Sequence, residues 1–172
     1  MKKRLLVLRH AKAERDSTTG RDFDRPLAER GRKDAAELGH AMRERGLRPD
    51  AVVASPAKRV VETLAALAEG CGPLAADYDQ RIYDASPGTL LEVVRQADDS
   101  AQALLLVGHN PGLQELLLDL ADRDARGLRD RVREKYPTAA LAVVELPSRS
   151  WSELRPRGGE IVELIVPRDL TD

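Results

Sequence analysis

Three short runs of apolar residues stand out in the first two thirds of the chain. They are Leu5–Leu8, Ala51–Ala54 and Ala103–Val107. Each is too short for a typical helix, and an uninterrupted apolar run of this length is typical of a strand buried on both faces. We therefore expect three buried strands, and strands of this kind belong mainly to parallel sheets.

The segments between these runs repeat apolar residues at helical spacing. One helix is expected from about Ala28 to Arg45, where Gly46 provides a C-terminal stop. A second helix is expected to start at Ser55-Pro56, with Ser55 as its N-cap and Pro56 as its first helical residue, and two more are expected to follow Ser86-Pro87 and Asn110-Pro111-Gly112. Strands that alternate with helices predict an α/β fold, a three-layer sandwich with a mostly parallel central sheet and helices on both faces.

The C-terminal third has a different pattern. Ala140–Leu146 is expected to form a strand. Trp151–Leu154 and Ile161–Val166 have the pattern of a hairpin around Gly158-Gly159, which would extend the sheet at its edge.

A charged segment, Asp124–Lys135, precedes this region and is expected to be a helical, solvated connector. The chain has no internal repeat, no low-complexity tract and no composition typical of a domain linker. We therefore expect residues 1–172 to form a single domain, a length that also suits one domain.

Charge and composition exclude several classes of protein. The 172 residues carry a formal net charge of −1, which argues against a general nucleic-acid binder. Six of the 28 basic residues are lysines, which leaves 22 arginines, the side chain that binds phosphate and carboxylate in a bidentate manner. Cys71 is the only cysteine, so neither an intramolecular disulfide nor a cysteine zinc cluster is possible. The apolar runs are far too short to cross a bilayer, and we expect a cytoplasmic, monomeric protein with no membrane partner.

The candidate chemistry lies directly after the three predicted buried strands. Arg9 and His10 follow the first strand, Arg59 lies in the first turn of the helix after the second, and His109 follows the third. Ligands of open α/β sheets bind beyond the carboxyl ends of the strands, so these side chains are expected to converge. Each of these three short motifs alone is more often a surface pair or a turn, but the three together make that reading the less favoured one. The chain has only one other histidine, His40, which lies in the middle of a predicted helix and is expected to be structural or exposed.

Two arginines and a helix N-terminus can bind the oxygens of a phosphoryl group and spread its charge. A neutral imidazole can attack phosphorus in line, and a second imidazole can donate a hydrogen bond as negative charge develops. These residue types therefore predict phosphoryl transfer through a phosphohistidine intermediate, with no metal ion and no cofactor required.

Three ordered motifs make the chain resemble a known family. They are Leu8–Ala11, Ser55–Arg59 with Glu62-Thr63, and Val107–Pro111. Together they resemble the signature of the histidine phosphatase superfamily, in its phosphoglycerate-mutase-like branch. The small size and the motif forms resemble most the SixA-type phosphohistidine phosphatases. The resemblance spans nearly the whole chain, including Pro137–Ala140 and Trp151.

The resemblance implies a role for each matching position. His10 would be the nucleophile that becomes phosphorylated, and Arg9, Arg59 and His109 would complete the phosphate pocket. Arg25, before Pro26-Leu27, would bind phosphate or substrate; the alternative is a loop arginine paired with a neighbouring aspartate.

Two departures from the superfamily pattern bear on the substrate. Ala11 replaces the glycine of many members, which SixA-type sequences tolerate, and only Asp84 is a loose match for the carboxylate general acid of larger relatives. The nitrogen that leaves a phosphoramidate is readily protonated, so such a substrate needs less help from an acid. The resemblance thus favours phosphohistidine on a protein as the substrate, in a pocket with no long covering insertions.

Other readings of the sequence stay open. A small-molecule phosphomonoesterase or a phosphoglycerate-mutase-like enzyme could use the same scaffold, and a non-catalytic phosphate-binding signalling module could use the same strand ends. A cysteine phosphatase is disfavoured, because it needs an arginine six places after its cysteine and Asp77 stands there. A haloacid-type phosphatase is disfavoured because 22–24 is a polar loop segment rather than the end of a buried strand.

Overall fold

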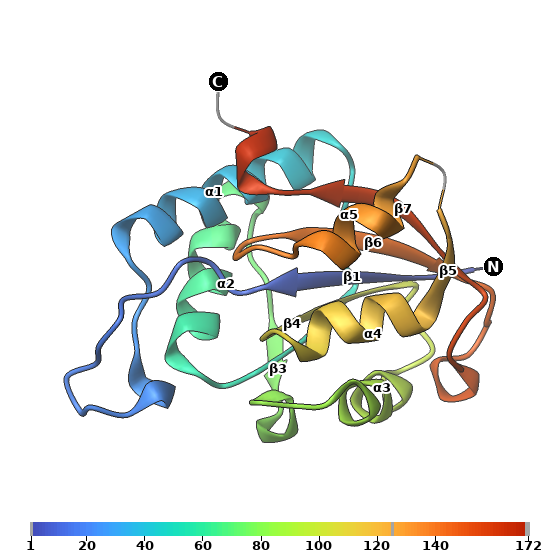
Figure 1. Cartoon of the computed structure of the whole chain (residues 1–172), viewed down its shortest axis with the longest axis horizontal. Helices are drawn as coiled ribbons and strands as arrows, with labels where there is room; N and C mark the ends of the chain where they lie inside the picture. Colours follow the sequence, from blue (N-terminus) through green and yellow to red (C-terminus); the bar gives the residue numbers. More distant parts are fainter. Residues whose placement is uncertain (1, 125, 171–172) are drawn as a thin grey trace.

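The structure is a computed structural model that describes residues 2–124 and 126–170. Within these residues seven strands form one sheet in the order β3-β2-β4-β1-β6-β7-β5 (Figure 1). The strands are β1 (Lys3–Arg9), β2 (Ala51–Ala54), β3 (Ala76–Tyr78), β4 (Ala103–Gly108), β5 (Ala121–Asp124), β6 (Leu141–Leu146) and β7 (Gly159–Ile165). Only β6 runs antiparallel to its neighbours, β1 and β7, so the sheet is mostly parallel as predicted.

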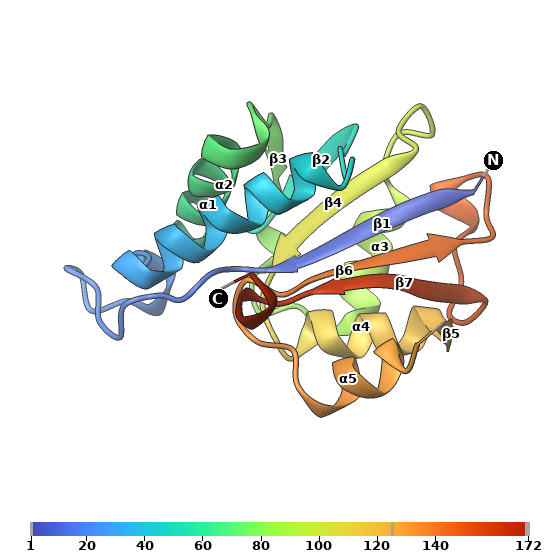
Figure 2. The ribbon, with the colours of Figure 1, turned by 90° about the horizontal axis from the view of Figure 1, so that it is seen from above.

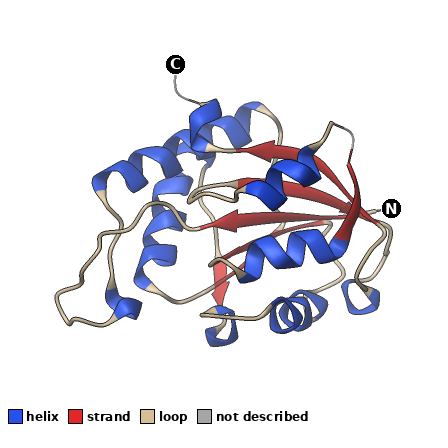
Figure 3. Ribbon diagram, in the orientation of Figure 1, coloured by secondary structure: helices blue, strands red, loops and turns tan. Residues whose placement is uncertain are grey.

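Helices cover both faces of this sheet, which confirms the predicted three-layer α/β fold. One face carries α1 (Glu29–Glu44) and α2 (Lys58–Cys71) (Figure 2). The other face carries α3 (Pro87–Arg95), α4 (Gly112–Leu120) and α5 (Leu128–Glu134) (Figure 3). None of these described helices is long and apolar enough to cross a membrane.

The central strand β1 shows why the apolar run is continuous. Leu5 and Val7 pack into the core beneath α3, α4 and α5, whereas Leu6 and Leu8 pack into the core beneath α1 and α2. All four side chains are buried. Successive residues of a strand point to opposite faces, so a strand between two helical layers needs an apolar residue at every position.

The predicted hairpin of Trp151–Leu154 with Ile161–Val166 is wrong. Residues Trp151–Glu153 form a short 3₁₀ helix, and β7 pairs instead with β6, while β5 occupies the outer edge. Trp151 is fully buried and its indole N–H donates to the Ala101 carbonyl at 2.9 Å. This segment therefore closes the end of the core beside β4, because a buried indole with a backbone partner is satisfied without strand pairing.

Two further elements differ from the predicted pattern in detail. The helix predicted to begin at Ser55-Pro56 begins at Lys58, with Ala57 as its N-cap. The charged segment Asp124–Lys135 contains the end of β5 and all of α5, with Ala125 outside the described residues. By contrast, the helix after Ser86 begins as predicted, because the Ser86 hydroxyl accepts a hydrogen bond from the Thr89 amide.

Close packing of α1 against α2 fixes the position of the helix that carries Arg59. Gly39 and Gly70 lie at this contact, where a Cβ on Gly39 would overlap the Leu67 carbonyl oxygen. A Cβ on Gly70 would overlap the His40 amide nitrogen. Glycine at both positions lets the two backbones touch, which a side chain would prevent.

Candidate active site

Strand register brings three strand ends to one level. Arg9 pairs with Gly108 across β1 and β4, and Ala54 pairs with Val107 across β2 and β4. The next residues along the chain, His10, His109 and Ser55, therefore emerge side by side at the carboxyl edge of the sheet. The ring centroids of His10 and His109 are 5.3 Å apart, so the structure brings the two histidines together.

His10 is oriented by its neighbour. Its Nδ1 lies 2.7 Å from the Ala11 carbonyl oxygen, which can only accept, so Nδ1 carries the proton and Nε2 holds the lone pair. The side chain is buried, and burial together with the charges of Arg59, Arg9 and Arg25 lowers its pKa to about 4. At neutral pH this imidazole is uncharged, which is the form that can attack phosphorus.

His109 is held from both sides. Its Nε2 lies 2.8 Å from the Ser55 hydroxyl, and its Nδ1 lies 3.4 Å from an Arg59 guanidinium nitrogen, which can only donate. Nε2 therefore carries the proton in this state, and Nδ1 is directed toward Arg59. Burial, and then the nearby charges of His10 and Arg59, lower the pKa of His109 to about 3.

Arg59 projects from the first turn of α2 and is buried, with 6% of its side chain exposed. Two of its guanidinium nitrogens are held by Asp22, one on the backbone carbonyl at 2.8 Å and one on the carboxylate at 3.0 Å. The same carboxylate accepts from the Tyr83 hydroxyl at 2.6 Å, and Arg25 donates to it at 2.9 Å. Hydrogen bonds from Tyr83, Arg25 and Arg59 hold the pKa of Asp22 well below its usual range.

Arg9 lies beside this cluster, with one guanidinium nitrogen donating to the Tyr136 carbonyl at 3.0 Å. Burial, and the charge of Arg59, lower the pKa of its guanidinium. The Nε atoms of both Arg9 and Arg59 are buried and have no hydrogen-bond partner within the described residues. Buried donors are normally paired, so two unpaired N–H groups beside two neutral imidazoles indicate a site that receives an anion.

The backbone around the nucleophile is tied to the helix that carries Arg59. The Thr63 hydroxyl accepts from the Ala11 amide at 3.0 Å and donates to the Arg59 carbonyl at 2.6 Å. Thr63 is fully buried. This one hydroxyl thus fixes the distance between the segment after β1 and the first turns of α2.

The other residues considered in the sequence, Arg25, Asp84 and His40, lie outside the pair formed by His10 and His109. Arg25 donates to the Glu14 carbonyl and pairs with Asp22, and its charge contributes to the lowered pKa of His10. Asp84 is exposed, and its carboxylate has no hydrogen bond within residues 2–124 and 126–170. His40 is exposed on α1, away from the site.

Sequence reasoning missed three residues of the site. Ser55 was predicted as a helix cap, but its hydroxyl accepts from the Ala57 amide at 3.2 Å and contacts His109. Its position directly after a buried strand was the available signal. Asp22 begins a short 3₁₀ helix and Tyr83 directly follows another, and no pattern marked them as partners of Arg59.

No cluster of three or more His, Cys, Asp or Glu side chains that could hold a metal ion occurs in the described part of the chain. The positive charges that act on His10 are those of the guanidinium groups of Arg9, Arg25 and Arg59.

Comparison with known proteins identifies the class. A family description, "Histidine phosphatase superfamily (branch 1)", matches residues 5–145, and this chain therefore belongs to that superfamily. An uncharacterised protein of Mycobacterium tuberculosis strain H37Rv, Rv1276c, is 35% identical over 164 residues, which cover 94% of this chain and 100% of that protein.

Two solved structures have the same fold over nearly their whole length. A putative phosphohistidine phosphatase SixA from Nakamurella multipartitia matches with a TM-score of 0.82 and 26% identity, covering 97% of each chain. A putative phosphohistidine phosphatase SixA from Agrobacterium tumefaciens matches with a TM-score of 0.77 and 27% identity, covering 97% of this chain and 99% of that one. Superfamily membership and these SixA-type structures support a phosphatase activity.

Proposed function

We propose that this protein is a phosphatase that works through a phosphohistidine intermediate on His10 and acts on phosphohistidine in proteins. The observation that carries the proposal is the pair of buried, unpartnered Nε–H groups of Arg9 and Arg59 beside the neutral imidazoles of His10 and His109. A phosphoryl group supplies acceptor oxygens for these donors, and its negative charge is complementary to the positive charge of the guanidinium groups.

In the proposed first step, the Nε2 lone pair of His10 attacks phosphorus while the bond from phosphorus to the substrate nitrogen breaks. The leaving imidazole takes that electron pair; when its other nitrogen is protonated, it departs as a neutral molecule. Arg9 and Arg59 donate to the phosphoryl oxygens. In the second step water attacks phosphorus, His10 leaves with the electron pair of its bond, and inorganic phosphate is released.

His109 would change protonation state during this cycle. Its Nδ1 lone pair faces the guanidinium of Arg59, where a phosphoryl oxygen would bind. An anion at this position favours the protonated imidazole and so raises the pKa of His109 from about 3. The Nδ1–H would then donate to the transferring group, while Nε2–H keeps its bond to Ser55.

The preference for phosphohistidine is supported by the SixA-type structures and by the exposure of Asp84. The alcohol of a phosphomonoester would leave as an alkoxide and requires a positioned acid, whereas the imidazole of a protonated phosphoimidazole leaves as a neutral molecule without one. The exposed carboxylate of Asp84 is not held in place by any described hydrogen bond.

The test compares initial rates on a phosphohistidine peptide, a set of sugar phosphates and an aryl phosphate, with and without EDTA. We expect the highest kcat/KM on the phosphohistidine peptide and no loss with EDTA. A clear preference for a sugar phosphate would instead establish a small-molecule phosphomonoesterase. Tight vanadate binding without turnover of any substrate would establish a non-catalytic phosphate-binding module.

A further inference from the structure

A cavity lies at the same edge of the sheet as the candidate active site. It has a volume of about 740 Å³. Leu8 pairs with Leu141 and Leu141 pairs with Ile165, so the end of β1, the start of β6 and the end of β7 meet at this edge. The segments just beyond these positions line the cavity, together with the first turns of α1 and the last turn of α5.

Only a short stretch of backbone separates the cavity from the catalytic candidates. The Ala139 amide donates to the carbonyl oxygens of Arg9 and His10, and Arg9 in turn donates to the Tyr136 carbonyl. Residues 137–138 of this stretch line the cavity, and Lys12, two residues after His10, lines it from another side. A ligand that spans both sites would therefore cross over residues 136–139.

The lining is strongly basic although the whole chain is not. Five cationic and two acidic side chains line the cavity, in a chain whose net charge is −1. They are Lys12, Arg30, Arg131, Lys135 and Arg168, and Asp34 and Glu134. Asp34 is paired with Arg30 at 3.2 Å and Asp169 lies 3.7 Å from Arg131, so the cations of the lining without an ion pair among the described residues are Lys12, Lys135 and Arg168. Lys12, Arg131 and Lys135 are exposed, and part of the remaining lining is apolar, including Leu164 and Val166.

We propose that this basic cavity is the docking surface for an acidic segment of the protein substrate, which follows or precedes the phosphohistidine in the chain. The inference rests on the proposed function. Exposed cations around an open, partly apolar floor suit an extended acidic peptide, whereas a small-molecule site would enclose its ligand. A peptide can cross residues 136–139 while its phosphohistidine reaches His10, and charges of this kind steer association and set specificity.

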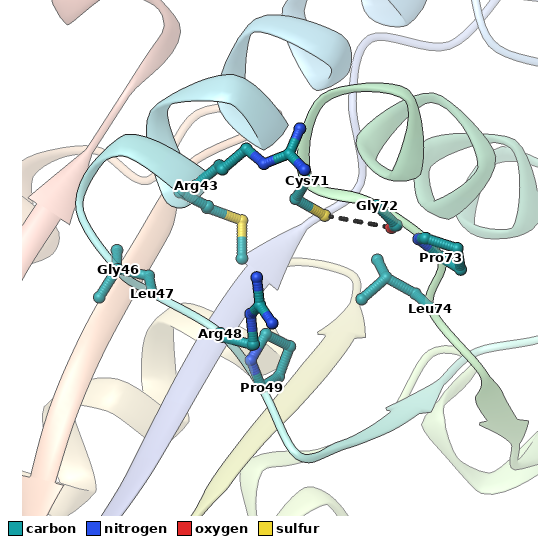
Figure 4. Close-up of a pocket in the computed structure, with 10 residues that line it drawn as sticks. Arg43, Gly46, Leu47, Arg48, Pro49, Cys71, Gly72, Pro73 and Leu74 are labelled. Carbon is teal, nitrogen blue, oxygen red and sulfur yellow. Dashed lines mark hydrogen bonds between the residues drawn. The ribbon is translucent and has the colours of Figure 1, made fainter.

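The molecule provides its own control cavity. A space of about 530 Å³ is lined by Arg43, Arg48 and Cys71 among others (Figure 4). Its lining segments precede β2 and β3, which run parallel to β1, so it lies at the opposite edge of the sheet from His10. Reversing charge there changes the overall charge by the same amount without touching the docking surface.

The experiment uses three phosphohistidine peptides of equal length, flanked by glutamates, by alanines or by lysines. Kinetics are measured for the wild type, for Lys135→Glu with Arg168→Glu, and for Arg43→Glu with Arg48→Glu. Two exposed ion pairs predict a wild-type kcat/KM about 2- to 30-fold higher for the glutamate peptide than for the alanine peptide. The docking variant should lose this preference with its rate on the alanine peptide unchanged, and the control variant should keep it. High salt should weaken the preference.

Several results would overturn the proposal. These are equal rates of the wild type on the glutamate and alanine peptides, a preserved preference in the docking variant, or an equal loss in the control variant. If the wild type dephosphorylates none of the three peptides, the proposed function fails. Docking is then judged by fluorescence anisotropy of the unphosphorylated glutamate peptide, where equal binding by wild type and docking variant would refute it. The cavity would be assigned to a small anion instead if two results were found together. The wild type would prefer a sugar bisphosphate to a monophosphate and lose this preference in the docking variant, and it would show no preference among the peptides.

Discussion

Replacing Thr63 with valine should weaken both the fold and the catalytic site. Valine has nearly the same shape but lacks the hydroxyl that accepts from the Ala11 amide and donates to the Arg59 carbonyl. Ala11 and Thr63 are both fully buried, so no water reaches the amide that the substitution leaves unpaired. An unsatisfied buried donor costs about 1–3 kcal/mol. For a domain of this size the melting temperature should therefore fall by about 2–12 °C.

The same substitution should slow catalysis. The Ala11 carbonyl orients the His10 ring, so a shift of the Ala11 backbone moves the proposed nucleophile. Misplacement of a reacting group by about 1 Å can cost roughly 100-fold in rate, which sets the upper limit of the expected loss in kcat.

Unfolding in urea can be followed by the fluorescence of Trp151, the single tryptophan, which is fully buried. Thr63→Ser is the matched control, because it keeps the hydroxyl and removes only a methyl group, at a cost of about 1 kcal/mol. Hydrolysis of an aryl phosphate reports activity. A valine variant as stable and active as the wild type would refute this reasoning, as would a serine variant that loses as much activity as the valine variant.

Three further predictions concern other parts of the structure. Ser55→Ala should lower kcat/KM about tenfold or more, because it leaves the buried Nε2–H of His109 unpaired; unchanged kinetics would contradict the role of this hydroxyl. The imidazole NMR signals of His10, whose pKa is lowered to about 4, should not titrate between pH 7 and 5. The free energy of unfolding should fall as pH drops from about 6.5 toward 4, because His10 binds a proton in the unfolded chain at a higher pH than in the folded protein. A titration midpoint of His10 near 6.5 in the folded protein would refute this. Gly39→Ala should destabilise the protein by more than about 2 kcal/mol, whereas Gly88→Ala, where a Cβ would meet only the Ser86 hydroxyl at 3.9 Å, should be nearly neutral.

The sequence predicted the sheet best where burial alone determines the pattern. Ala51–Ala54 forms β2 with those same bounds, because both faces of this strand are covered. β3 escaped prediction, since its three residues, Ala76–Tyr78, are largely exposed and carry no apolar pattern. The segment at Trp151 was misassigned because its conformation depends on a hydrogen bond to Ala101, which is 50 residues away.

The candidate site follows the same division. His10, Arg59 and His109 could be predicted to converge, because parallel strands place their carboxyl ends at one edge. The residues that orient these side chains could not be predicted from the sequence. Asp22 meets Arg59 across 37 residues, and Ser55 meets His109 across 54, through contacts that only the folded backbone defines.

The most direct test of the central claim is to trap the intermediate. The wild-type protein is mixed with a ³²P-labelled phosphohistidine peptide, quenched rapidly in alkali and digested for mass spectrometry. We predict label that is stable to alkali and labile to acid, on the peptide that contains His10, and none in His10→Ala, which should also lack turnover. Turnover retained by His10→Ala, or label on another residue, would contradict the mechanism.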